Sequence, residues 1–95
     1  MDMILKENKV LQGLITFERS SYSDERGIFS RLYCDKNLTK LKFKPNQINS
    51  VFNPRKHTFR GLHFQVAPYE ETKIISCTQG EILDIVVDLR LHSPT

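Results

Sequence analysis

The stretch that decides the fold is Thr58-Phe59-Arg60-Gly61-Leu62-His63-Phe64-Gln65. It sets an arginine, a glycine and a histidine inside an apolar run that otherwise has the composition of a buried strand. Side chains alternate between the two faces of a strand, so Leu62 and Phe64 share one face. His63 and Gln65 share the other. The alternation predicts a strand with one face on a core, and in a barrel the face with His63 can line a pocket.

Lys73 begins the next apolar run, ten residues after His63. A base that works near neutral pH and a cation on adjacent strands indicate a site that removes a proton and stabilises the resulting anion. A lone histidine in a strand is, however, more often a structural group. A solvent-facing strand face with salt bridges would also accommodate Arg60, Gln65 and Lys73, so both interpretations stay open here.

The composition is that of one small globular domain. The chain has 95 residues, of which 39% are hydrophobic and 26% charged, with a net charge of +3. The densest basic cluster is interpreted as a solvated loop and comprises Lys36, Lys40, Lys42 and Lys44. A nucleic-acid interface is the alternative, but no recognition helix, zinc-finger spacing or RNP-like motif supports it. We therefore predict no nucleic-acid partner.

The cysteines and the N-terminus bear on the compartment. Cys34 and Cys77 are far apart in apolar runs, which is typical of buried thiols in a reducing cytoplasm. The N-terminus becomes charged too early for a secretory signal, and no apolar run is long enough to span a bilayer. We expect a cytoplasmic protein with no membrane partner.

Turn-forming residues separate short apolar runs along the chain. The expected strands cover residues 10–17, 28–33, 47–52, 58–65, 73–78 and 81–90. Residues 20–27 have the composition of a turn, and residues 36–45 are expected to hold one short helical turn. About six strands and little helix predict an all-β fold, an antiparallel sandwich or barrel, in one domain over residues 1–95.

The last two expected strands form the clearest hairpin. Gln79-Gly80 predicts a two-residue connection in which Gly80 adopts a positive φ. With that turn, Lys73 and Asp84 fall on the same face of the hairpin.

A metal site is a further possibility, because small β-barrels often bind metals through closely spaced histidines. His57 and His63 are six residues apart, and Gln65 occupies the position where a second histidine would complete a His-x-His pair. Glu70 or Glu71 would add one oxygen, which leaves the set short of ligands. We therefore predict no metal.

Several motifs follow one another in a distinctive order. They are Asp24-x-Arg26-Gly27-x-Phe29, Gln47-x-Asn49, Arg60-Gly61-Leu62-His63-Phe64-Gln65, Pro68, Lys73, Gly80, Asp88-Leu89-Arg90 and Ser93-Pro94-Thr95. In this order they resemble the N-terminal half of the dTDP-4-dehydrorhamnose 3,5-epimerase family, over nearly the whole chain. The resemblance implies a cupin-type jelly roll, of which residues 1–95 would form the N-terminal part.

The resemblance also implies roles. His63 matches the base that takes the protons at C3 and C5 of a dTDP-4-keto-6-deoxy sugar, and Lys73 matches the cation beside the C4 oxygen. The matched substrate contacts are Arg26 and Arg60, for the nucleotide diphosphate, and Gln47 and Asn49. The family belongs to deoxysugar biosynthesis, needs neither metal nor redox cofactor, and works as a homodimer that exchanges N-terminal strands.

Elementary chemistry supports these roles. A proton beside a ketone leaves as the carbonyl becomes an enolate, so both a base and an oxyanion donor are required. A preorganised donor such as Lys73 is worth about 3–4 kcal/mol to the enolate. Arginine binds phosphate oxygens in bidentate fashion.

Two departures from the family pattern qualify the resemblance. Arg31 occupies a substrate-binding position where the family usually carries a glutamate that touches the nucleotide, so the preference for dTDP stays open. The family's tyrosine general acid and histidine-orienting aspartate lie in a half with no counterpart here, and we expect a fragment. A non-catalytic sugar-nucleotide-binding module or an inactive fragment is therefore the alternative to an isomerase. A structural β-domain that associates with another chain is a third interpretation.

Overall fold

The structure is a computed structural model that describes residues 3–42 and 44–95, without the side chain of Lys40. The chain divides into two compact units. The terminal unit comprises Met1–Pro45 with Val87–Thr95, and the central unit comprises Asn46–Val86. Each unit is described by itself below.

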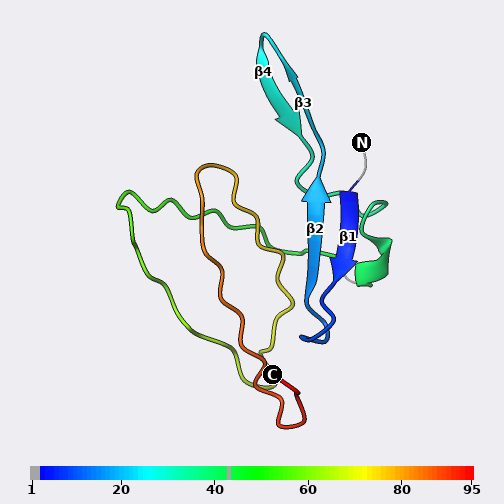
Figure 1. The fold of residues 1–95 in the computed structure, drawn as a ribbon, viewed down its shortest axis with the longest axis vertical. Coiled ribbons are helices and arrows are strands. Elements are labelled where there is room, and N and C mark those ends of the chain that lie inside the picture. Colours follow the sequence, from blue (N-terminus) through cyan, green and yellow to red (C-terminus); the bar gives the residue numbers. More distant parts are fainter. Residues whose placement is uncertain (1–2, 43) are drawn as a thin grey trace. The chain divides into compact units, whose positions relative to one another are not determined.

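The terminal unit begins with an antiparallel hairpin of β1 (Met3–Glu7) and β2 (Ile15–Arg19). The ladder runs from Met3 opposite Arg19 to Glu7 opposite Ile15 (Figure 1). In the connecting turn, the Asn8 Oδ1 atom accepts the backbone N–H groups of Val10 at 2.9 Å and Leu11 at 2.7 Å. Asparagine favours such turns because its side chain can bind nearby backbone donors. The expected strand over residues 10–17 is therefore a turn followed by β2.

A second antiparallel hairpin joins β3 (Ser21–Asp24) to β4 (Gly27–Ser30). The expected turn over residues 20–27 is thus mostly a strand, with the reversal confined to two residues. Gly27 has a φ of +133°, which favours glycine at the point where β4 begins. The strand expected over residues 28–33 is present in shorter form and ends at Ser30.

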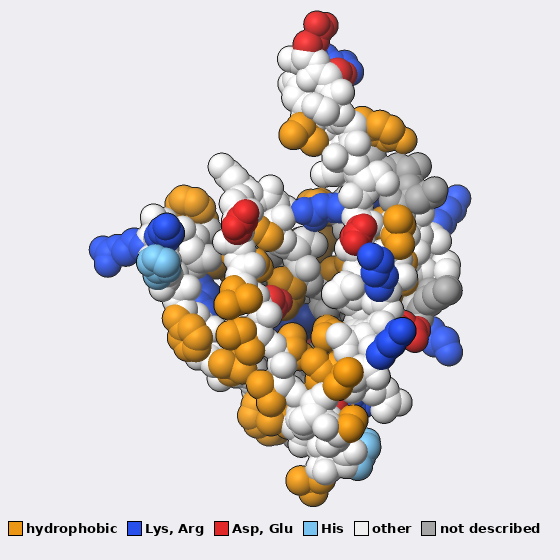
Figure 2. Space-filling view, viewed as in Figure 1, with side chains coloured by type: hydrophobic (Ala, Val, Ile, Leu, Met, Phe, Trp, Pro, Cys, Tyr) orange, Lys and Arg blue, Asp and Glu red, His pale blue; other side chains and the backbone are white. Residues whose placement is uncertain are grey.

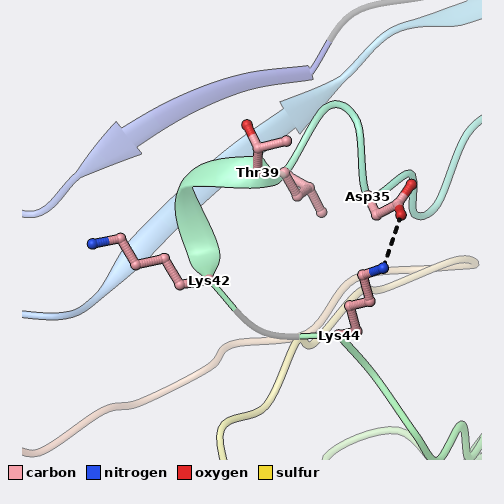
Figure 3. Close-up of a pocket in the computed structure, with 5 residues that line it drawn as sticks. Asp35, Thr39, Lys42 and Lys44 are labelled. Atoms are coloured by element: carbon pink, nitrogen blue, oxygen red, sulfur yellow. Dashed lines mark ion pairs between the residues drawn. The ribbon is translucent and has the colours of Figure 1, made fainter.

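The short helical turn predicted within residues 36–45 is confirmed as the 3₁₀ helix η1 (Thr39–Leu41). Lys42 follows in the left-handed conformation, with a φ of +56°, and ends the helix. Figures 1 and 3 both place η1 beside the β1–β2 ladder. The buried hydrophobic side chains of the described residues are Met3 and Leu38, which form the small core of this unit.

The central unit contains none of the strands expected over residues 47–52, 58–65 and 73–78, so the hairpin expected between residues 73–78 and 81–90 is absent as well. Its backbone passes through bends at residues 55–57, 67–69 and 79–80 without a ladder (Figure 1). A strand needs a hydrogen-bonded neighbour, and among the described residues of this unit the backbone forms a turn instead, in which the Tyr69 N–H donates to the Val66 oxygen at 2.9 Å. Gly80 does adopt the predicted positive φ, at +80°.

Apolar side chains of the central unit lie open to solvent. No residue of Asn46–Val86 is buried, and Ile48, Phe52 and Leu83 are 90%, 82% and 86% exposed. Figure 2 shows many apolar side chains on the viewed surface. The described pairing is all-β and antiparallel, which confirms the fold class and is consistent with an incomplete cupin-like jelly roll. Within the described residues, no helix has the length and apolarity needed to cross a membrane.

Candidate active site

The predicted site residues are divided between the two units. The central unit carries Gln47, Asn49, Arg60, His63 and Lys73, whereas Arg26 and Arg31 belong to the terminal unit. The two sets are therefore considered separately.

His63 lies close to the backbone at Gly61. A Cβ atom placed on Gly61 would be 3.0 Å from His63 Nδ1 and 3.3 Å from the His63 backbone nitrogen. Gly61 also has a φ of +95°, which an L side chain rarely adopts. Two features therefore favour glycine at this position of the Arg-Gly-Leu-His motif. One is the positive φ of its backbone, and the other is the closeness of the His63 imidazole.

His63 and Lys73 are both exposed. Among the described residues, no hydrogen bond or ion pair holds either side chain. The ladder that would set the register of Lys73 and Asp84 is absent, so their placement on one hairpin face stays a prediction. The two groups expected to do the chemistry are present, but this unit offers no buried surroundings that would orient them.

Arg60 has a specific partner in the central unit. Its Nε–H donates to Asn53 Oδ1 at 2.8 Å, across the bend that precedes residues 58–65, which we call the organising stretch. That bend is closed by the Thr58 hydroxyl, which donates to the Arg55 carbonyl at 2.7 Å, and His57 adopts a φ of +66° within it. Asn53 lies between the strands expected over residues 47–52 and 58–65, and sequence reasoning missed it as a partner of Arg60.

Gln47 and Asn49 are exposed at the start of the central unit. Their alternation with Ile48 is that of a strand, but no ladder forms there to fix their faces. Their predicted contacts with substrate stay a prediction.

Arg26 is held at the tip of the β3–β4 hairpin. Asp24 Oδ1 accepts the Arg26 backbone N–H at 2.8 Å, and Asp24 Oδ2 accepts from Arg26 Nη2 at 2.7 Å and from Nε at 3.2 Å. The hydrogen bonds from the Arg26 side chain, and then from its backbone, lower the pKa of Asp24. The same carboxylate raises the pKa of Arg26. Arg26 is therefore oriented, and its charge is balanced by a carboxylate.

Arg31 follows β4 and is half-buried. Its Nη1 atom donates to Asn37 Oδ1 at 3.3 Å, in the turn that leads into η1. The guanidinium at the position that departs from the family pattern is thus engaged within the terminal unit.

A hollow of about 530 Å³ also lies in the terminal unit. It is lined by Asp35, Leu38, Thr39, Lys42 and Lys44. Figure 3 shows Lys44 directed toward Asp35, at 3.7 Å, and Lys42 directed away from them. None of the predicted site residues lines this hollow, so it is separate from the candidate site. Among the described residues, no three His, Cys, Asp or Glu side chains gather to hold a metal ion.

Comparison with known proteins gives a consistent match. The family model described as dTDP-4-dehydrorhamnose 3,5-epimerase matches residues 8–95. A protein of that name from Streptomyces griseus is 36% identical over 88 residues, which cover 90% of this chain and 44% of the relative. One from Shigella flexneri is 35% identical over 88 residues, covering 86% of this chain and 46% of the relative.

A third relative carries a narrower name. The dTDP-4-dehydrorhamnose 3-epimerase of Streptomyces niveus is 31% identical over 88 residues, which cover 90% of this chain and 42% of the relative. The chain thus spans somewhat less than half the length of these curated relatives. No solved structure gives a significant match.

Proposed function

The chain belongs to the dTDP-4-dehydrorhamnose 3,5-epimerase family, and on that premise we propose that it supplies the proton-transfer residues of a sugar-nucleotide epimerase. The substrate would be a dTDP-4-keto-6-deoxy sugar, and the product would serve the biosynthesis of dTDP-rhamnose or a related deoxysugar. One observation carries the proposal. The family match over residues 8–95 includes every predicted site residue, from Arg26 to Lys73.

The proposed reaction is a proton transfer at a carbon beside the ketone. His63 removes the hydrogen from C3 or C5, and the electron pair of the broken C–H bond moves through the adjacent carbon to the C4 oxygen. Lys73 donates a hydrogen bond to that oxygen and stabilises the enolate. A water molecule from the solvent protonates the opposite face, which inverts the carbon, and His63 releases its proton to the solvent. Because C3 and C5 flank the same carbonyl, one base and one cation can serve both.

The arginine and amide side chains of the predicted site would bind the nucleotide end of the substrate. Arg60 and Arg26 would bind diphosphate oxygens, and Gln47 and Asn49 would contact the substrate through their amide groups. Binding of these distant groups holds the sugar in a reactive pose. Arg31 would also contact the nucleotide, and its hydrogen bond with Asn37 gives it a structural role in the terminal unit.

Two properties of the assembly complete the proposal. The enzyme would be a cytoplasmic homodimer that exchanges N-terminal strands, and it would use no metal or redox cofactor. The exposed apolar side chains of the central unit support association, because surfaces of this kind mark contacts between proteins. The 95 residues would form part of a single epimerase domain.

The direct test is isotope exchange. We would incubate the protein with dTDP-4-keto-6-deoxyglucose in D₂O and follow deuterium at C3 and C5 by NMR. We expect uptake by the wild-type protein and none by His63→Ala, since the base is lost. Uptake at C3 alone would assign a 3-epimerase, as the Streptomyces niveus relative is named. Equal uptake by the wild type and His63→Ala would contradict the role of His63.

The second candidate is a binding module that holds the sugar nucleotide without turnover. The observation in its favour is that the chain spans only 44% to 46% of the first two relatives. Calorimetric titration with dTDP separates the two. Binding without deuterium exchange would favour the module, and binding with exchange the isomerase.

A further inference from the structure

The two arginines predicted to bind phosphate have chemically different partners. Arg60 donates through Nε to the neutral amide oxygen of Asn53, at 2.8 Å. Arg26 donates through Nε and Nη2 to the carboxylate of Asp24, at 3.2 and 2.7 Å. Both side chains are thereby oriented, but only one of them faces a negative charge.

This difference bears on anion binding. A guanidinium is planar, so an acceptor on Nε fixes the plane in which the terminal nitrogens lie. Among the described residues, neither terminal nitrogen of Arg60 meets a protein acceptor. A neutral amide leaves the guanidinium charge intact, whereas the Asp24 carboxylate balances the charge of Arg26 and occupies one terminal nitrogen.

We propose that Asn53 is a positioning residue, which orients the Arg60 guanidinium without neutralising it. Arg60, rather than Arg26, then supplies most of the attraction for the diphosphate. The inference deepens the proposed function and rests on it for the identity of the ligand. Asn53 itself touches no substrate in this proposal and acts only through Arg60.

The positioning part is tested by NMR of the arginine Nε–H groups, with no ligand present. We expect the Arg60 Nε–H to exchange slowly with water in the wild type, and faster in Asn53→Leu, which has a similar size but no acceptor. Asn53→Asp retains an acceptor and should keep the slow exchange. Asn46→Leu, at an exposed asparagine of the same unit, is the matched control and should resemble the wild type.

The charge part is tested by the affinity for dTDP. Asn53→Leu should weaken binding roughly three- to tenfold, the effect of one lost hydrogen bond. Asn53→Asp should also weaken binding, because it orients Arg60 but balances its charge. Asp24→Asn should not weaken binding by more than about twofold, since it frees the charge of Arg26 while keeping an acceptor.

The outcomes separate this inference from the proposed function. Unchanged Nε–H exchange in Asn53→Leu would overturn the positioning role whatever the ligand. A stronger loss from Asp24→Asn than from Asn53→Leu would overturn the ranking of the two arginines. Failure of the wild type to bind dTDP would overturn the nucleotide-binding proposal and the anion role of Arg60 together. A slow Nε–H that depends on Asn53 would still support positioning in that event.

Discussion

At the scale of single residues, the organising stretch places an imidazole so close to Gly61 that an added methyl group would push the ring aside. The imidazole of His63 lies against Gly61, whose positive φ excludes most other residues. The position of the base is therefore sensitive to a substitution two residues away.

Gly61→Ala is predicted to reduce deuterium exchange at least tenfold, because the new methyl group would meet His63 Nδ1 at 3.0 Å and displace the ring. Gly80→Ala is the matched control, since Gly80 has a φ of +80° and open space around it. Both variants should lose about 1 kcal/mol or more of stability through backbone strain. Equal activity losses in the two would show that strain, and not the imidazole, is responsible.

Lys73→Gln is predicted to lower the exchange rate by about 10²–10³-fold, since it removes the cation that stabilises the enolate. Lys73→Arg keeps the charge and should retain more activity than Lys73→Gln. Rates measured at saturating substrate, alongside calorimetric dTDP affinity, check this role. A loss of dTDP affinity that matches the loss of rate would place Lys73 in binding instead.

Sequence reasoning at this scale found the residues with distinctive chemistry and missed those that orient them. The alternation of the organising stretch singles out His63 without any structure. Asn53 and Asp24 act through hydrogen bonds to arginines, and their residue types are equally typical of ordinary turns. Nothing in their spacing distinguishes an orienting side chain from a turn-forming one.

At the scale of elements, a hydrogen bond from Arg90 fastens the last segment of the terminal unit to the β1–β2 turn, and an ion pair with Asp88 orients the Arg90 side chain. Arg90 Nη2 donates to Asp88 Oδ2 at 2.7 Å and to the Gln12 carbonyl at 2.6 Å. The Asp88 side chain is only 7% exposed. The hydrogen bond from Arg90 holds the pKa of Asp88 well below the ordinary aspartate value of about 3.9.

This pair predicts a specific loss of stability in acid. The pKa of Asp88 is lower in the folded than in the unfolded chain. The Asp88 carboxylate therefore adds to the free energy of unfolding above about pH 4, and this stabilisation is lost as the pH falls further. The urea concentration at the unfolding midpoint of the wild type should decrease as the pH is lowered below 4. Asp88→Asn should be less stable than the wild type at pH 7, and its midpoint should change less with pH. Glu18→Gln, in the exposed pair with Lys6, should change stability by less than about 1 kcal/mol. If the urea midpoints of the wild type and Asp88→Asn changed equally with pH, Asp88 would not be the cause of the loss of stability in acid.

Sequence reasoning predicted β4 and the 3₁₀ helix η1 but missed β1 and β3, although both of these strands pair with a neighbour nearby in the sequence. The hairpin of β3 and β4 and the 3₁₀ turn η1 depend on local contacts, although β3 itself was taken for a turn because Ser21-Tyr22-Ser23 is mostly polar. The strands expected over residues 73–78 and 81–90 are adjacent in the sequence, and they still form no ladder here. The alternation of apolar residues can be seen in one segment, but a ladder also requires a second segment that forms hydrogen bonds with the first.

At the scale of the whole molecule, the central unit leaves its apolar side chains uncovered. Single exposed hydrophobic residues are ordinary, but a unit of 41 residues, Asn46–Val86, without one buried residue is not. Large uncovered apolar surfaces drive association between proteins.

The 95-residue chain is therefore expected to bind the dye ANS strongly and to self-associate, which fluorescence and light scattering would measure. Mixing it with the second half of the Streptomyces griseus relative should reduce ANS binding, if that half covers the same apolar side chains. A monomer without ANS binding would contradict the expectation. The β1–β2 hairpin has its own ladder and should be little changed by the mixing.

The absence of a ladder around His63 also has a temporal consequence. The imidazole of the proposed base lies on a segment that no neighbouring strand holds, so no ladder fixes the direction in which it would accept a proton. Closure of the sheet would give it that direction at the same moment as it buries the surrounding apolar residues. Completion of the sheet and onset of the proposed proton transfer would then be a single event.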